Sequence, residues 1–107
     1  MNSTIQLPSI PRVIKLFKRQ NGTEPWMNEP LIYVLNEFAK RDELGVELTP
    51  AEFVWTLRSA LETYAQRLSS LWLMGFREAQ PQFMRLFCKT VARGEAQDEL
   101  LARLRSL

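Results

Sequence analysis

Histidine is absent from this sequence and cysteine occurs once, and these two scarcities exclude several kinds of catalytic and metal site. Histidine is the commonest general base and a frequent ligand of zinc, copper and haem iron, so serine–histidine and cysteine–histidine catalysis within one chain are excluded. A single cysteine, Cys88, cannot form an internal disulfide, a CxxC redox pair or a structural zinc site. It follows Phe87 in an apolar stretch, where we expect it to be a small buried hydrophobe. The sequence therefore favours a binding protein over an enzyme, with no cofactor and no metal.

Clustered glycines and long apolar runs are also missing. The four glycines stand alone and far apart, so the sequence contains no Gly-rich phosphate-binding loop. The longest apolar run, residues 71–76, has six residues, whereas a membrane-spanning helix needs about 18. No apolar secretory segment follows Met1. We therefore expect a cytoplasmic protein that is not embedded in a membrane.

Apolar residues recur with a helical period along most of the 107 residues, a length that suits one ordinary domain. Near the N-terminus, for example, Ile10, Ile14 and Phe17 fall on one helical face. The pattern predicts an all-α fold, a small single-domain bundle of four or five helices. Residues 1–8 are expected to be a flexible N-terminal arm, and residues 9–107 to form the helical domain.

Capping residues and helix breakers indicate where the helices begin and end. The expected helices are residues 10–21, 28–41, 50–79, 81–93 and 96–104. The clearest start is a capping box, in which the Thr49 hydroxyl accepts from the Glu52 N–H and the Glu52 carboxylate accepts from the Thr49 N–H. Gly45 is expected to end the second helix in a left-handed conformation. The Ser69–Ser70 pair weakens the third helix without ending it, so this helix is expected to continue almost to Pro81, where the fourth begins.

The net charge of +2 hides four blocks of alternating sign. Residues 1–20 carry +4, residues 21–52 carry −5, residues 53–93 carry +4 and the remainder carries −1. The charges of the first block all lie on the expected N-terminal helix, at Arg12, Lys15, Lys18 and Arg19.

This basic amphipathic helix could lie on an anionic membrane or act as a mitochondrial transit peptide, but four charges are few for membrane anchoring and transit peptides are typically richer in Arg and Ser. Two main interpretations of this helix follow. Its apolar face can dock on the bundle, in which case the cations meet water or the acidic block. Alternatively, the cations bind nucleic-acid phosphate together with Arg58, Arg67 and Arg77. The second interpretation makes nucleic acid the alternative partner to another protein.

Two tryptophans are candidate partner-binding residues. Trp55 points away from the apolar Phe53 on a polar helix face, so it is either exposed or covered by a later helix. Trp26 lies in an expected loop beside Pro25, where it either caps the bundle or is presented to a partner. Because Trp is enriched at binding hot spots, both tryptophans join the four N-terminal cations in the expected partner-binding set.

The apolar run of residues 71–76 has no polar face on a helix, so it must be buried from several directions. It is either the central pillar of the bundle or part of an interface between two copies, formed by Leu71, Trp72 and Phe76. Homodimers with two-fold symmetry are the commonest assembly, and the sequence therefore favours self-association.

The expected function is that of a small, non-enzymatic protein-interaction module. Such an adaptor, inhibitor or regulatory subunit would bind a macromolecular partner through exposed aromatic residues and segregated charge. The alternative is a nucleic-acid-binding or nucleoprotein-regulating protein that uses the basic N-terminal helix. An enzyme comes third, because it would need acid–base or Mg²⁺ chemistry from the acidic block, at Glu37, Asp42, Glu43 or Glu47.

Overall fold

A computed structural model describes residues 3–22 and 24–107, which contain five α-helices and one two-stranded antiparallel sheet. The helices are α1 (Ile10–Asn21), α2 (Pro25–Lys40), α3 (Pro50–Ala65), α4 (Ser70–Val91) and α5 (Gly94–Arg105). The strands are β1 (Ile5–Gln6) and β2 (Glu47–Leu48). The prediction of a small, single-domain, all-α bundle is confirmed.

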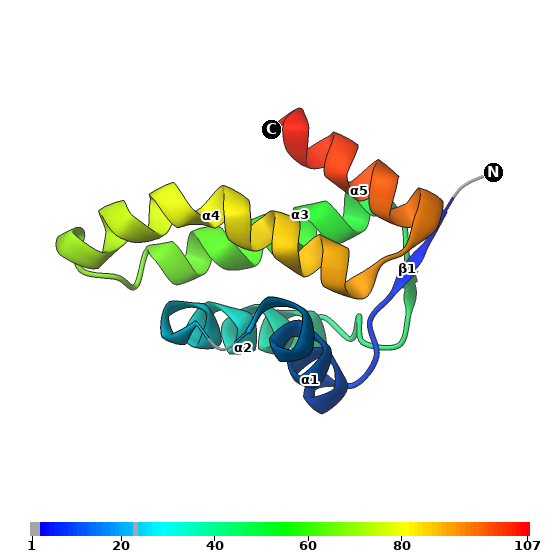
Figure 1. Ribbon diagram of the computed structural model, residues 1–107, viewed down its shortest axis with the longest axis horizontal. Coiled ribbons are helices and arrows are strands. Elements are labelled where there is room, and N and C mark those ends of the chain that lie inside the picture. Colours follow the sequence, from blue (N-terminus) through cyan, green and yellow to red (C-terminus); the bar gives the residue numbers. More distant parts are fainter. Residues whose placement is uncertain (1–2, 23) are drawn as a thin grey trace.

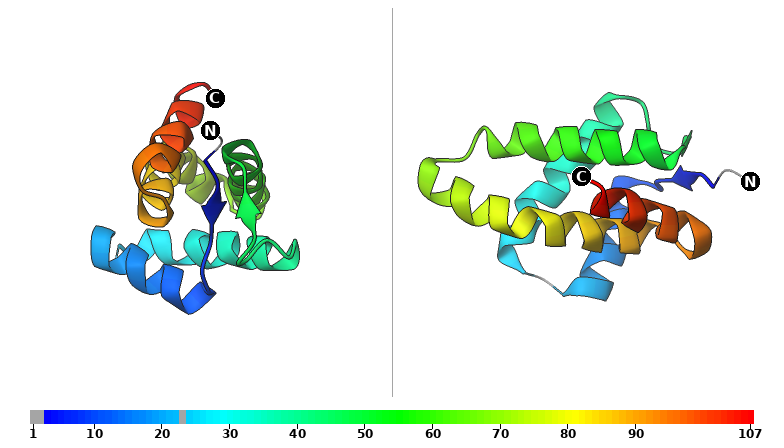
Figure 2. Two further views of the ribbon diagram at one scale, coloured as in Figure 1. Left: turned by 90° about the vertical axis from the view of Figure 1, so that its right-hand side faces the viewer. Right: turned by 90° about the horizontal axis from the view of Figure 1, so that it is seen from above.

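The helices are arranged around an antiparallel hairpin formed by α3 and α4 (Figure 1). Helices α1 and α2 pack on one side of this hairpin, and α5 packs on the other. Seen from above, α2 crosses beneath the hairpin, whereas α5 lies over the half of α4 that is away from the α3–α4 connection (Figure 2). The hairpin therefore forms the long axis of a molecule measuring 44 × 30 × 26 Å.

Five buried phenylalanines connect four of the helices. They are Phe17 of α1, Phe38 of α2, Phe53 of α3, and Phe83 and Phe87 of α4. Neighbouring rings in this cluster have centroids 5.2–6.3 Å apart. Such aromatic pairs contribute about 0.5–1.5 kcal/mol each beyond the area they bury, so the cluster stabilises the packing of α1 and α2 against α3 and α4.

The capping box at the start of α3 is confirmed. The Thr49 hydroxyl accepts from the Glu52 N–H at 3.2 Å, and the Glu52 carboxylate accepts from the Thr49 N–H at 2.9 Å. The hydrogen bonds from the backbone and side chain of Thr49 lower the pKa of Glu52, because they favour its charged form. Pro50 occupies the first turn, where its missing N–H has no intrahelical partner to lose.

Helix α2 ends differently from the prediction. The left-handed residue directly after the helix is Asp42, with φ 55°, and Gly45 is also left-handed three residues later, with φ 74°. The Asp42 N–H donates to the carbonyl of Ala39 and the Glu43 N–H donates to that of Phe38, which is the hydrogen-bond pattern of a Schellman motif. Asp tolerates the left-handed region better than most residues, so glycine was not required at this position.

The N-terminal segment also differs from the prediction of a flexible arm, since its described part packs on the bundle. Strand β1 pairs with β2 in a register that places Ile5 opposite Leu48. The carbonyl of Leu7 accepts from the Gly45 N–H at 2.8 Å, and the side chains of Ile5 and Leu7 are buried. The alternation of buried Ile5, exposed Gln6 and buried Leu7 is the period of a strand, and burial of the two apolar residues holds the segment on the bundle.

Two helix boundaries also differ from the prediction. The long third helix breaks at residues 66–69, and Ser69 takes the extended backbone conformation of an N-cap. Helix α4 then continues through Pro81, which lies on an exposed face where water can satisfy the carbonyl freed by the missing N–H. Helix α2 begins at Pro25, so Trp26 lies in its first turn rather than in a loop.

Truncation of Leu7 tests whether the N-terminal segment belongs to the core. Leu7→Ala is expected to lower the free energy of unfolding by about 2–5 kcal/mol, because it leaves a cavity beneath β1. The matched control is Thr4→Ala at an exposed position, with an expected change within about 0.5 kcal/mol. Urea unfolding followed by circular dichroism measures both, and equal stabilities of the two variants would contradict the docked segment.

Candidate functional site

The single thiol is not available for chemistry. Cys88 is fully buried in α4, and this burial raises its pKa to about 12. The thiolate is the nucleophilic form of cysteine, so the thiol is unreactive near neutral pH. The prediction that Cys88 serves as a small buried hydrophobe is confirmed.

Of the four acidic residues considered for acid–base or Mg²⁺ chemistry, Glu37 and Glu43 make different contacts. Glu37 pairs with Lys40 at 3.5 Å on α2. Glu43 pairs with Arg41 at 3.3 Å and accepts a hydrogen bond from the Thr56 hydroxyl at 2.9 Å. Within residues 3–22 and 24–107, no three Asp, Glu, Cys or His residues come together in a way that could hold a metal ion.

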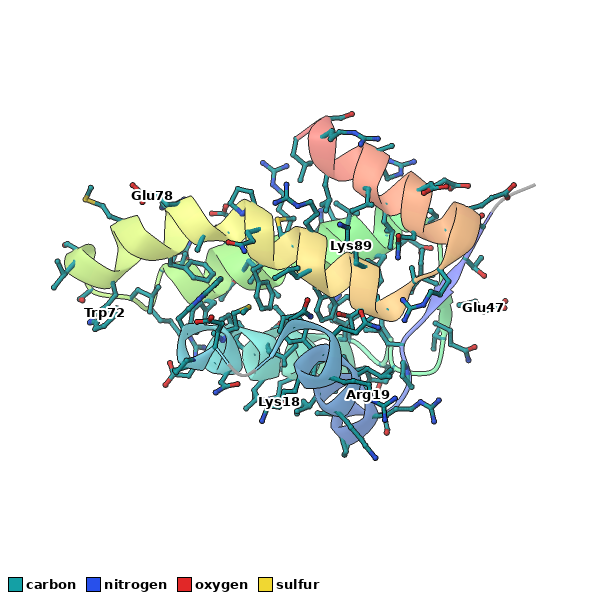
Figure 3. All side chains as sticks on the ribbon, viewed as in Figure 1. Lys18, Arg19, Glu47, Trp72, Glu78 and Lys89 are labelled. Atoms are coloured by element: carbon teal, nitrogen blue, oxygen red, sulfur yellow. The ribbon has the colours of Figure 1, made fainter. Side chains whose placement is uncertain are left out.

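Three large apolar side chains are exposed at the start of α4, where the hairpin turns. Leu71, Trp72 and Met74 are 82%, 70% and 72% exposed, and we call this surface the hairpin tip. Figure 3 shows Trp72 at the far end of the hairpin, away from α5. The interpretation of residues 71–76 as a central pillar is therefore wrong.

Phe76 does not belong to this exposed surface. It is buried, and its ring packs edge-on against that of Tyr64 with centroids 5.1 Å apart. Its assignment to an interface between copies is corrected by this packing within the chain. Of the three residues predicted for self-association, Leu71 and Trp72 remain accessible.

Aromatic and polar contacts hold the hairpin near its tip against α2. The Tyr64 hydroxyl donates to the Glu29 carboxylate at 3.2 Å, and the Tyr33 ring lies 5.5 Å from the Tyr64 ring. Desolvation and the neighbouring Glu29 carboxylate raise the pKa of Tyr64. The Arg67 guanidinium lies 5.0 Å from the Tyr33 ring centroid. The hairpin tip is thus carried on a braced part of the fold.

The two tryptophans predicted for partner binding differ in their exposure. Trp55 is 57% exposed on α3, and the Arg41 guanidinium lies 4.6 Å from its ring centroid. Trp55, Thr56 and Glu43 border a shallow depression. Trp26 is only 38% exposed.

The four cations of α1 all lie on its solvent side. Val13 and Phe17 are buried against the bundle, which confirms docking of the apolar face. Arg12, Lys15, Lys18 and Arg19 are exposed, and Figure 3 shows Lys18 and Arg19 at the outer edge of the molecule. In the part of the chain that the structure describes, the ion pairs lie on other helices and loops and none joins α1 to the acidic block.

A second basic surface was missed by the sequence analysis. Side chains from α3, α4 and α5 line an open groove with a volume of about 610 Å³, which we call the basic groove. Its cations are Arg58, Arg77, Arg85, Lys89 and Arg105. The sequence contains a signal that could have predicted this surface. Steps of four residues keep side chains on one helical face, and such steps separate Arg77, Pro81, Arg85 and Lys89.

The basic groove is lined by residues of α3, α4 and α5, and helices α5 and α1 lie on opposite sides of the hairpin (Figures 1 and 2). Arg58 and Arg77 therefore do not extend the surface of α1, and Arg67 lies against Tyr33. The nucleic-acid interpretation of the sequence grouped Arg58, Arg67 and Arg77 with the N-terminal cations. In the structure these three arginines lie apart from the α1 cations.

The environment of Cys88 leads to a direct test of its reactivity. With a pKa of about 12, about one thiol in ten thousand is ionised at pH 8, and the side chain is also inaccessible. Ellman's reagent is therefore expected to label the native protein no faster than it unfolds, and to label one thiol per chain in guanidinium chloride. Rapid labelling of the native protein would contradict the buried position.

The described helices include none that is both long and apolar enough to cross a lipid bilayer. Comparison of the chain with protein-family models, curated proteins and solved structures gave no significant match.

Proposed function

We propose that this protein is a small, non-enzymatic interaction module that acts as an adaptor, inhibitor or regulatory subunit. The observation that carries the proposal is the hairpin tip, where Leu71, Trp72 and Met74 are each at least 70% exposed. Burial of apolar surface lowers the free energy by roughly 25 cal/mol per Å², so the complex with a partner that covers these side chains is stabilised. Exposed apolar groups gathered in one place are typical of binding surfaces.

The geometry of the tip suits recognition of another protein. Its three side chains project from a single turn of α4, and the contact of Tyr64 with Phe76 braces the helix behind them. A preorganised surface loses little conformational entropy on binding. Trp supplies a large rigid contact, and Met adapts to an irregular partner surface. Trp55 and its neighbour Arg41 offer a smaller, second contact of the same aromatic kind.

A second copy of the chain is one partner that the tip can accept, and a homodimer belongs to this proposal. Leu71 and Trp72 would meet their own counterparts across a two-fold axis. The cytoplasm is proposed as the compartment, because one buried thiol without a disulfide partner suits a reducing environment.

Nucleic-acid binding is the second candidate function, and a specific observation favours it. Four cations stand exposed along α1, and none of the ion pairs in the described residues involves them. Unpaired cations on one helix can release counterions from nucleic-acid phosphate.

The proposed function predicts the effect of truncating Trp72. Trp72→Ala is expected to weaken partner binding at least tenfold, since a central Trp often contributes about 2 kcal/mol or more, whereas folding stability changes by less than about 0.5 kcal/mol. A photo-crosslinking amino acid at position 74, in the native host, captures the protein that lies against the tip. Light scattering of the pure protein then reports whether that partner is a second copy.

The matched control is Gln82→Ala, at an exposed polar position on the same helix. Trp55→Ala measures the contribution of the second aromatic contact. The proposal fails if Trp72→Ala changes neither the crosslinked protein, nor its affinity, nor the oligomeric state.

The alternative predicts a salt-dependent interaction through α1. Lys15→Glu/Arg19→Glu is expected to abolish binding of a labelled duplex or single-stranded oligonucleotide, measured by fluorescence anisotropy in about 50 mM salt. The wild-type affinity should fall with salt with a logarithmic slope of up to about −4, near one per contacted phosphate. The absence of any anisotropy change at this salt concentration excludes the alternative.

A further inference from the structure

The basic groove collects positive charge from three helices. Arg58 comes from α3, Arg77, Arg85 and Lys89 from α4, and Arg105 from α5. Glu62 is the one acidic side chain among the described residues that line it. The lining side chains therefore carry a net charge of +4, twice that of the whole chain.

These charges are poorly neutralised within the described part of the chain. Arg77 lies 3.9 Å from Glu62, at the limit of an ion pair, and the other ion pairs involve Arg41 and Lys40, outside the groove. Like charges that share a concave surface repel one another and raise the local positive potential. An anionic occupant would relieve this repulsion, so the charge pattern favours an acidic ligand.

The floor of the groove is apolar. Met84 is buried at its base, and Pro81, Leu101, Leu104 and Leu107 line it further. A simple anion such as phosphate would leave these side chains in water. The floor therefore favours a ligand that has apolar side chains as well as negative charge.

Nucleic acid fits this lining less well than a peptide. Single-stranded nucleic acids bind largely by stacking of bases on aromatic side chains, and the described lining of the groove includes no aromatic residue. Aliphatic floors between helices instead accept the Leu, Ile or Phe anchors of an amphipathic helix at i, i+3, i+4 and i+7.

We propose that the basic groove between α3, α4 and α5 is a docking site for an acidic amphipathic helix of a partner protein. The apolar face of that helix would lie on Met84, Leu101 and Leu104, and its flanking carboxylates would pair with cations such as Arg85 and Lys89. The site is separate from the hairpin tip, because the tip residues do not line the groove. The protein would thus have two independent binding surfaces.

Selection from a peptide library tests the proposal even though the partner is unidentified. A displayed library of random peptides, each long enough for about four helical turns, is selected on the full-length protein and counter-selected on Arg85→Glu/Lys89→Glu. Enriched peptides are expected to combine Glu or Asp with apolar residues at helical spacing. The two substituted residues are exposed, and circular dichroism verifies that the fold of the variant is retained.

A matched pair of variants assigns the binding to the groove. An enriched peptide should bind Arg85→Glu/Lys89→Glu at least tenfold more weakly than the wild type, measured by fluorescence anisotropy. Lys15→Glu/Arg19→Glu changes the net charge equally on the opposite side of the hairpin and should leave the affinity within twofold. Leu107→Ser, at an exposed position of the floor, should weaken binding severalfold without changing any charge.

Several outcomes would overturn the proposal. These are enrichment of no peptide, enrichment of peptides that are not acidic, and equal binding to the two charge-reversal variants. An oligonucleotide that binds wild type, is lost in Arg85→Glu/Lys89→Glu and competes with the peptide would reassign the groove to nucleic acid. Trp72→Ala is expected to bind the peptide like wild type, so failure of the groove and failure of the hairpin tip can be told apart.

Discussion

Contact among five buried phenylalanine rings is the interaction on which the rest of this structure depends. Phe38 of α2, Phe53 of α3 and Phe87 of α4 contact one another, and Phe83 extends the cluster to Phe17 of α1. Because the rings come from four helices, they determine that α1 and α2 lie on one side of the α3–α4 hairpin. The other side is left for α5, which packs there through the buried Leu100.

The positions of the two candidate surfaces follow from this packing. Helix α5 has 12 residues and α4 has 22, so α5 covers only part of the hairpin and leaves its turning end in water (Figure 1). The apolar side chains of Leu71, Trp72 and Met74 lie at that uncovered end. Where α5 does lie over α3 and α4, cations from all three helices meet above an apolar floor.

The sequence predicted those features of the structure that depend on a few neighbouring residues or on the nature of one side chain. The capping box of Thr49 and Glu52, the end of α1 at Asn21 and the burial of Cys88 are all confirmed, because each depends on neighbours in sequence or on strong intrinsic preference. The turn at Asp42 that follows α2 and the break between α3 and α4 at residues 66–69 were less evident. Asp42 and Gly45 both take a left-handed φ, and the apolar spacing does not show which of them directly follows the last helical turn. At the hairpin, Ser69 is the N-cap of α4 while Pro81 lies inside that helix.

The sequence by itself determined the helical class, the absence of histidine and of an internal disulfide, and the division of charge into blocks. These depend on composition and on a period of about 3.6 residues, which are local properties. Only the tertiary structure decided that Ile5 and Leu7 are buried, that Trp72 is exposed, and that Arg58 and Arg105 share one groove. The physical reason is that side-chain burial and the grouping of charges depend on which helix faces pack together. Arg58 and Arg105 are 47 positions apart in the sequence, and they come together only through that packing.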